Sequence, residues 1–176
     1  MEIVKREILY RTGFCDFVGK TLRGQESSPP YYALQQADYV SIVAVTSEDQ
    51  LLLVRQFRPA VETFTLELPA GFVESDENPQ ECASRELIEE TGYEAGQLEE
   101  LGCLVPDTGR LCNRLHCFFA GNLARRDPGY HPEPGVELVY CPLTNVVNWI
   151  LEGRLSHGLH VAALFLATLR GKIRVQ

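Results

Sequence analysis

The 176-residue chain is long enough for one domain with a substantial core, or one domain plus a small appendage. Its formal net charge of −8 argues against a nucleic-acid backbone or an anionic membrane as the main partner. The charge does not argue against a phosphate-bearing small molecule, because bound cations and a few arginines can reverse the local field.

Targeting signals and cysteine motifs are not recognisable. Residues 1–6 lack the apolar core of a signal peptide, and the longest apolar helical run, residues 159–169, is about half a membrane span. The six cysteines contain no CxxC pair. Cys112, His116 and Cys117 could be proposed as zinc ligands, but no second ligand pair has suitable spacing. We therefore expect a cytoplasmic protein with reduced thiols.

The first third of the chain is predicted to form strands. Polar residues alternate through the opening segment, which suits a small antiparallel sheet. The expected strands are residues 2–10, 14–22, 31–35, 39–46 and 51–55. The last two flank a turn at residues 47–50, so we expect them to form a hairpin. Arg58, next to Pro59, could bind a phosphate or a carboxylate as a fork, or form a surface salt bridge.

A helix with strong end signals lies within residues 71–93, GFVESDENPQECASRELIEETGY. Asn78 is an N-cap residue, Pro79 fits the first helical position, and Glu81 closes a capping box. Gly92 is a natural C-cap. The apolar Ala83 and its neighbour Leu87 can face a core.

This helix carries three carboxylates where a helix tolerates them least. Glu86, Glu89 and Glu90 crowd one flank, and each like-charge pair costs roughly 0.2–0.5 kcal/mol. Glu89 and Glu90 also lie in the last turn, where the helix dipole repels anions by roughly 0.3–1 kcal/mol each. A solvated acidic face is one interpretation. Glu77 and Arg85 favour another, in which the carboxylates bind a hard divalent cation such as Mg²⁺.

A resemblance to the Nudix box of the Nudix hydrolases is carried by Gly71, Glu77 and the run Arg85-Glu86-Leu87-Ile88-Glu89-Glu90-Thr91-Gly92. Every fixed polar position and glycine of that 23-residue pattern is filled. The preceding RQFRPAVETFTLELPAG is similar to the ADP-ribose pyrophosphatase branch of the family. Thr108 stands where that branch usually has a proline, a departure that bears on the substrate and not on the hydrolase class.

The resemblance implies roles for the matching residues. Glu86 and Glu90 would be the principal metal ligands, with Glu89 and the Ala70 carbonyl completing the site around Mg²⁺, for which Mn²⁺ can substitute. Other residues would hold the geometry of the loop and helix: Gly71, Glu77, Arg85 and Gly92. Candidate substrate-binding residues are Arg58, Glu67 and an aromatic residue for base stacking, Tyr32 or its neighbour Tyr31.

Later segments supply a catalytic candidate and a packing helix. Strands are expected near residues 98–105 and 115–120. In the polar loop 124–135, Glu133 is the candidate general base, with Glu137 the alternative and Glu89 next to be considered. The last helix, residues 157–170, is expected to pack through a stripe of Val161, Leu164, Phe165, Thr168 and Leu169. His157 and His160 have no obvious third metal ligand.

The implied fold is α/β: an α/β/α sandwich around a mixed sheet in residues 40–176, with a small antiparallel sheet in residues 1–39. The implied activity is Mg²⁺-dependent hydrolysis of a nucleoside diphosphate-sugar, with ADP-ribose or an ADP-sugar leading and GDP-mannose or UDP-glucose as rivals. Related pyrophosphatases swap the N-terminal segment, which implies a homodimer. The other function class is a non-catalytic Nudix-like sensor. Such sensors usually lose box carboxylates, and none is lost here.

Overall fold

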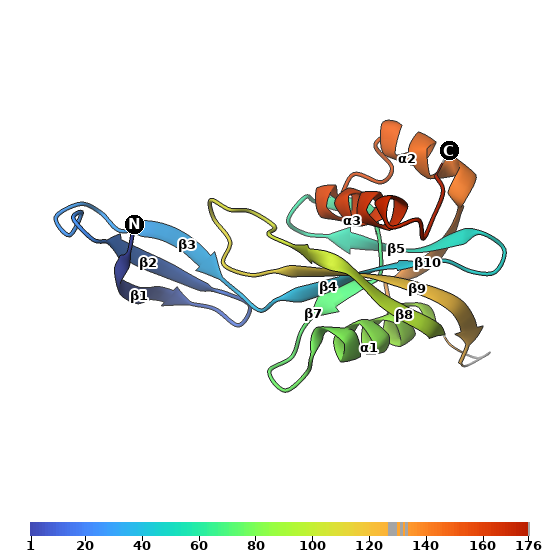
Figure 1. Ribbon diagram of the computed structural model, residues 1–176, viewed down its shortest axis with the longest axis horizontal. Coiled ribbons are helices and arrows are strands. Elements are labelled where there is room, and N and C mark those ends of the chain that lie inside the picture. The colour runs from blue at the N-terminus through green and yellow to red at the C-terminus, as the bar shows by residue number, and fades with distance from the viewer. Residues whose placement is uncertain (127–129, 131, 133, 176) are drawn as a thin grey trace.

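The computed structural model describes residues 1–126, 130, 132 and 134–175. The chain folds into an α/β body from which a small N-terminal sheet projects (Figure 1). This confirms the predicted fold class. In the described residues, no helix combines the length and apolar character needed to cross a membrane.

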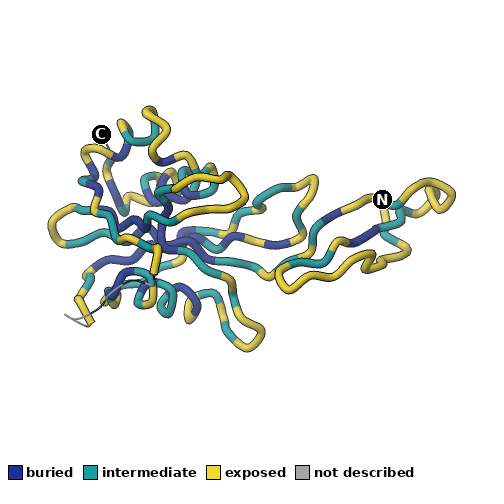
Figure 2. Tube along the Cα trace, turned by 180° about the vertical axis from the view of Figure 1, so that it is seen from behind, coloured by how far each residue is buried: buried dark blue, intermediate teal, exposed yellow. Residues whose placement is uncertain are grey.

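The projecting sheet is antiparallel and has the order β1-β2-β3. Its strands are β1 (Ile3–Arg11), β2 (Asp16–Leu22) and β3 (Tyr31–Gln35). It meets the body through Leu34, whose backbone N–H donates to the Arg110 carbonyl at 2.8 Å and whose carbonyl accepts from Cys112 N at 3.0 Å. Most of its residues are exposed, in contrast to the body (Figure 2).

Two further sheets form the body. The four-stranded sheet has the order β7-β4-β9-β8, and the three-stranded sheet has the order β10-β5-β6. The strands are β4 (Tyr39–Ala44), β5 (Gln50–Arg58), β6 (Thr63–Glu67), β7 (Ala70–Phe72), β8 (Tyr93–Leu104), β9 (Leu115–Arg125) and β10 (Glu137–Pro142). The pairing of β4 with β9 is parallel, and the other body pairs are antiparallel.

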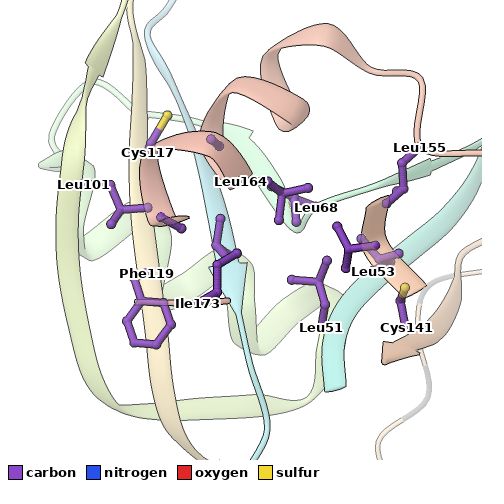
Figure 3. Packing of buried hydrophobic residues seen from close by; sticks show 14 of the residues in the cluster. Leu51, Leu53, Leu68, Leu101, Cys117, Phe119, Cys141, Leu155, Leu164 and Ile173 are labelled. Atoms are coloured by element: carbon purple, nitrogen blue, oxygen red, sulfur yellow. The ribbon is translucent and has the colours of Figure 1, made fainter. Parts of the chain in front are cut away.

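Helices cover both faces of the four-stranded sheet (Figure 1). The helices are α1 (Pro79–Thr91), α2 (Val146–Leu151), α3 (Gly158–Leu169) and a 3-10 turn at Leu143–Asn145. Alternation along β4 sends Ile42 to the α1 side, where it joins Ala83 and Leu87, and sends Val43 to the α3 side. Leucines of β5 and α3 meet in the larger cluster (Figure 3).

Two expectations about packing are confirmed only in part. The predicted hairpin is limited to one bridge between Val45 and Leu51, because β4 and β5 then enter different sheets. Of the predicted stripe, helix α3 buries Leu164, and with it His160, Ala163 and Ala167, which the stripe did not include. Phe165 is exposed, because the alanine-rich face lets the helix approach the sheet closely while larger side chains point outward. Leu169 is exposed for the same reason.

Candidate active site

The box helix begins and ends where the sequence predicts. The Asn78 side chain accepts hydrogen bonds from Gln80 N and Glu81 N, each at 3.0 Å, and Glu81 Oε2 accepts from Asn78 N at 3.1 Å. Gly92 has the left-handed φ of 73°, and its N–H donates to the Ile88 carbonyl. The capping box therefore fixes one end of α1 and the glycine cap the other, which places the last-turn carboxylates beside β7.

Arg85 organises the acidic flank. Its guanidinium contacts Glu77 Oε1 at 2.9 Å, Glu86 Oε1 at 2.7 Å and Glu89 Oε2 at 3.0 Å. Hydrogen bonds from Arg85 lower the pKa of Glu77 and in turn raise the pKa of Arg85. Among the described residues Arg85 forms no ion pair with Glu90, so three of the four carboxylates share this single cation.

Glu90 has fewer favourable contacts for its negative charge than the carboxylates that contact Arg85. Its Oε2 accepts a hydrogen bond from Ala70 N at 2.9 Å. Burial, with a smaller effect from the Glu86 carboxylate, raises the pKa of Glu90 to about 7. Burial also raises the pKa of Glu86. A cation placed here would relieve both effects.

The site has room and donors for a hard metal ion. A cavity of about 100 Å³ is lined by Glu86, Glu89, Glu90 and Val136. Gly71 makes this arrangement possible, because a Cβ there would lie 1.9 Å from Glu86 Oε1. Carboxylate oxygens are the donors that Mg²⁺ prefers, so the chemistry of these side chains fits a hard divalent cation, although the three glutamates do not bring one oxygen each within 4.8 Å of one another.

A second polar cluster lies on the other side of β7. Arg58 donates to Glu67 through two parallel bonds, Nε to Oε1 at 2.8 Å and Nη2 to Oε2 at 2.7 Å. Thr65 Oγ1 donates to Glu67 Oε1 at 2.6 Å. Burial opposes ionisation of Glu67, but these hydrogen bonds outweigh it and lower the pKa of Glu67 to about 2. The Arg58 guanidinium therefore binds the carboxylate of Glu67 within the same chain.

His157 and His160 complete that cluster, contrary to the expectation that they lack a third ligand. One ligand atom from each histidine and one from Glu67 lie within 4.8 Å of one another. These residues line a cavity of about 280 Å³ that also reaches Arg58 and Ala70. The sequence signal that could have found the set is the pair of histidines at the start of an apolar helix.

The remaining candidates are dispersed. Tyr32 lies in the N-terminal sheet, exposed, with its ring stacked on Phe17 at a centroid distance of 5.4 Å. Glu133 lies outside the described residues. Glu137 is a strand residue whose Oε2 contacts Arg55 at 3.0 Å. Tyr130, from the loop before β10, donates a hydrogen bond to the Glu89 carbonyl and so joins this loop to the end of α1.

The proposed zinc ligands are not brought together as a set. Among the described residues, the only group that offers three metal ligands within reach of one another is the one with Glu67. Cys117 is buried in β9, and all six cysteines are free thiols.

The NUDIX domain family model matches residues 35–158, and the chain belongs to this family; it is a Nudix hydrolase. The methanol dehydrogenase activator of Bacillus methanolicus is 32% identical over 127 residues, 71% of this chain and 69% of that protein. The ADP-ribose pyrophosphatase of Bacillus subtilis is 39% identical over 85 residues, 48% of this chain and 46% of that protein.

Other similarities agree with this assignment. The GDP-mannose pyrophosphatase of Pectobacterium atrosepticum is 31% identical over 132 residues, 69% of this chain and 67% of that protein. A crystal structure of an ADP compounds hydrolase superposes with a TM-score of 0.77 at 20% identity, covering 98% of this chain and 96% of that chain. At that identity the structural likeness supports the fold.

Proposed function

We propose that this protein hydrolyses the diphosphate bond of a nucleoside diphosphate-sugar in a Mg²⁺-dependent reaction, with ADP-ribose or an ADP-sugar as the substrate and AMP and a sugar phosphate as products. The observation that carries the proposal is the group of box carboxylates beside β7, where Glu90 is partly buried with a pKa raised to about 7. Named relatives acting on ADP-ribose and GDP-mannose support the substrate class.

Glu86, Glu89, Glu90 and the Ala70 carbonyl would hold the metal. When bound, Mg²⁺ would neutralise charge on the diphosphate and make a bound water more acidic. Arg85 keeps Glu86 and Glu89 in place through the contacts described above. Gly71 and Gly92 allow the close approaches that this geometry requires.

In the proposed reaction, water attacks one phosphorus and the bond to the bridging oxygen breaks, with the electron pair leaving on the departing phosphate. Glu133 is proposed to take the proton of the attacking water. Glu89 is the alternative base. Arg58 and Glu67 are proposed to bind the substrate next to Ala70, since they line the cavity that reaches this residue.

We propose residues 1–39 as a dimerisation segment and residues 40–176 as the hydrolase domain. The N-terminal sheet exposes many large apolar side chains for its size, and exposed apolar patches mark sites of protein–protein interaction. These side chains are Val4, Ile8, Leu9, Tyr10, Phe14, Phe17, Tyr31 and Tyr32. A second copy of the chain would cover them, and Tyr32 could then stack on a nucleotide base.

The test is a panel of nucleotide sugars with Mg²⁺: ADP-ribose, ADP-glucose, GDP-mannose and UDP-glucose, scored by the nucleoside monophosphate formed. We expect the ADP compounds to have the highest kcat/KM and Glu86→Gln to abolish turnover. Glu94→Gln is the matched control, because Glu94 is an exposed acid on β8. Binding of a nucleotide sugar without turnover under all metal conditions would instead support the sensor class.

The general base is tested by a pair of variants. Glu133→Gln should lower kcat by about 10²–10⁴-fold while metal binding persists. Glu137→Gln should change kcat little, since its contact with Arg55 lies at the exposed end of a strand pair. The reverse result would assign the base to Glu137, and near-wild-type rates for both would direct the test to Glu89.

A further inference from the structure

The 280 Å³ cavity is lined by polar side chains, and one of them, His157, has a buried nitrogen without a hydrogen-bond partner among the described residues. It lies beside Ala70, whose N–H binds the box residue Glu90, and its inner wall carries His157 and His160. This volume is at the lower end of the range for small-molecule sites. It therefore suits one moiety of a nucleotide sugar rather than the whole molecule.

The tautomer of His160 follows from its surroundings. The side chain is buried, with 4% of the residue exposed, and its Nδ1 accepts a hydrogen bond from Leu68 N at 3.1 Å. In a neutral imidazole the other nitrogen then carries the proton. Burial lowers the pKa of His160 to about 3, which keeps it neutral. The Nε2–H is left as a donor on the cavity wall, with no acceptor assigned to it in the part of the chain described.

His157 occupies a position where its residue type does not help the fold. It is the N-cap of α3, yet its side chain makes no capping hydrogen bond within the described residues. Ser, Thr, Asp and Asn are the residues that stabilise this position. Instead the ring stacks on His160 at a centroid distance of 3.9 Å. Its Nδ1 is buried and finds no hydrogen-bond partner among residues 1–126 and 134–175 or the other described positions.

A metal ion does not fit this cluster despite the suitable spacing. A metal would need the Nε2 lone pair of His160, but that nitrogen is protonated while Nδ1 accepts from Leu68. Glu67 Oε1 already accepts from Arg58 Nε and Thr65 Oγ1, and Oε2 accepts from Arg58 Nη2, which leaves one free lone pair on Oε2. The cluster therefore offers a fixed donor on His160, one free acceptor position on Glu67, and an imidazole nitrogen of His157 that can donate or accept.

We propose that His157 and His160 are specificity-determining residues that bind a hydroxyl group of the ribose or sugar adjoining the diphosphate. A hydroxyl both donates and accepts, so it can accept from His160 Nε2–H and donate to Glu67 or His157. A phosphate oxygen can only accept and would leave the acceptors without a partner. This proposal rests on the proposed function for the identity of the ligand, because Ala70 places the cavity next to the diphosphate.

Two variants remove the hydroxyl contacts with little damage to the fold. In His160→Asn the amide oxygen can take the place of Nδ1 and keep the bond from Leu68, while the Nε2–H donor is lost. In His157→Ser the imidazole is lost and a favourable cap is introduced, so the melting temperature should rise by a few degrees. His116→Asn is the matched control, since His116 lies on β9 near Asp38 and Glu100.

The assay is a binding cycle by calorimetry with the non-hydrolysable α,β-methylene analogue of ADP-ribose and with analogues that each lack one ribose hydroxyl. Each histidine variant should weaken binding of the full ligand by about 5–150-fold, the cost of an unpaired buried polar group. The deoxy analogue that lacks the hydroxyl contacted by the histidines should bind equally weakly to the wild type and to both histidine variants. His116→Asn should bind every ligand as wild type does.

Several results would overturn the proposal: unchanged affinity in both variants, the same loss with every analogue, or no measurable binding of any ligand to the wild type. A Co²⁺ absorption band that disappears in His157→Ser would show a metal site in place of a hydroxyl site. Lower stability of His157→Ser would assign the residue a structural role. If the wild type binds the analogue in this pattern but hydrolyses no nucleotide sugar, the inference stands and the proposed function fails.

Discussion

Replacing Glu90 by glutamine should stabilise the metal-free protein while abolishing activity. The substitution keeps an oxygen that can accept from Ala70 N, a bond of 2.9 Å in the structure. It removes a negative charge that is buried, close to Glu86 and in the last turn of α1, where no basic residue lies. Each of these features disfavours the charge in the folded state.

The size of the effect follows from the shift in the pKa of Glu90 from 4.5 to about 7. Between these pH values the folded protein retains a proton that the unfolded chain releases, so stability falls as pH rises through this range and is constant above it. This difference in pKa lowers the free energy of unfolding of the wild type by about 3 kcal/mol at pH 8. For a chain of this length that is a rise in Tm of about 6–12 °C in Glu90→Gln.

Differential scanning calorimetry in EDTA from pH 4.5 to 8.5 provides the measurement. The difference in Tm between Glu90→Gln and wild type should be small at pH 4.5, grow toward pH 7 and then level off. Glu94→Gln, a change of the same charge on an exposed strand position, should show little difference at any pH. A Glu90→Gln protein that is less stable than wild type at pH 8 would refute the reasoning and make Glu90 a structural residue.

Three other perturbations test separate parts of the site. Millimolar Mg²⁺ should raise the wild-type Tm, because a ligand that binds only the folded state stabilises it, and calorimetry should show this shift reduced in Glu86→Gln. Gly92→Ala should lower the free energy of unfolding in urea by about 1 kcal/mol or more, since φ is 73° and the new Cβ would lie 2.6 Å from the Tyr130 ring. Glu67, with its pKa lowered to about 2, contributes stability above pH 4.5 that is lost as pH falls toward 2. Urea titrations of Glu67→Gln should therefore show a flatter acid dependence than wild type; an unchanged slope would contradict the assigned pKa.

Local sequence signals predicted the box helix well. Asn78, Pro79, Glu81 and Gly92 act within one or two turns of the chain, so their geometry is set by nearby backbone and could be inferred without tertiary structure. The contact of Arg85 with Glu89 follows from the i, i+4 spacing of the helix.

Contacts between distant segments were harder to predict. The hydrogen bond from Leu68 N to His160 joins positions 92 residues apart, and no periodicity in either segment specifies it. The separation of β4 and β5 into different sheets also depends on their neighbours, β9 and β10, which come later in the chain. The buried face of α3 was predicted only in part: Leu164 is buried as expected, but alanines, rather than Phe165 and Leu169, fit against the sheet.

The five residues from Glu67 to Gly71 explain why the two polar clusters belong to one site. Glu67 supplies the carboxylate held by Arg58, the Leu68 N–H orients His160, and the Ala70 N–H binds Glu90. Pro69 offers no N–H, and its carbonyl accepts from Ile42 N at 2.9 Å, which ties the segment to β4. Different groups of one short backbone segment thus contact the carboxylates of α1 and the residues of the histidine cavity. A change in its path would disturb both clusters together, so variants at Pro69 should impair metal binding and ligand affinity in parallel.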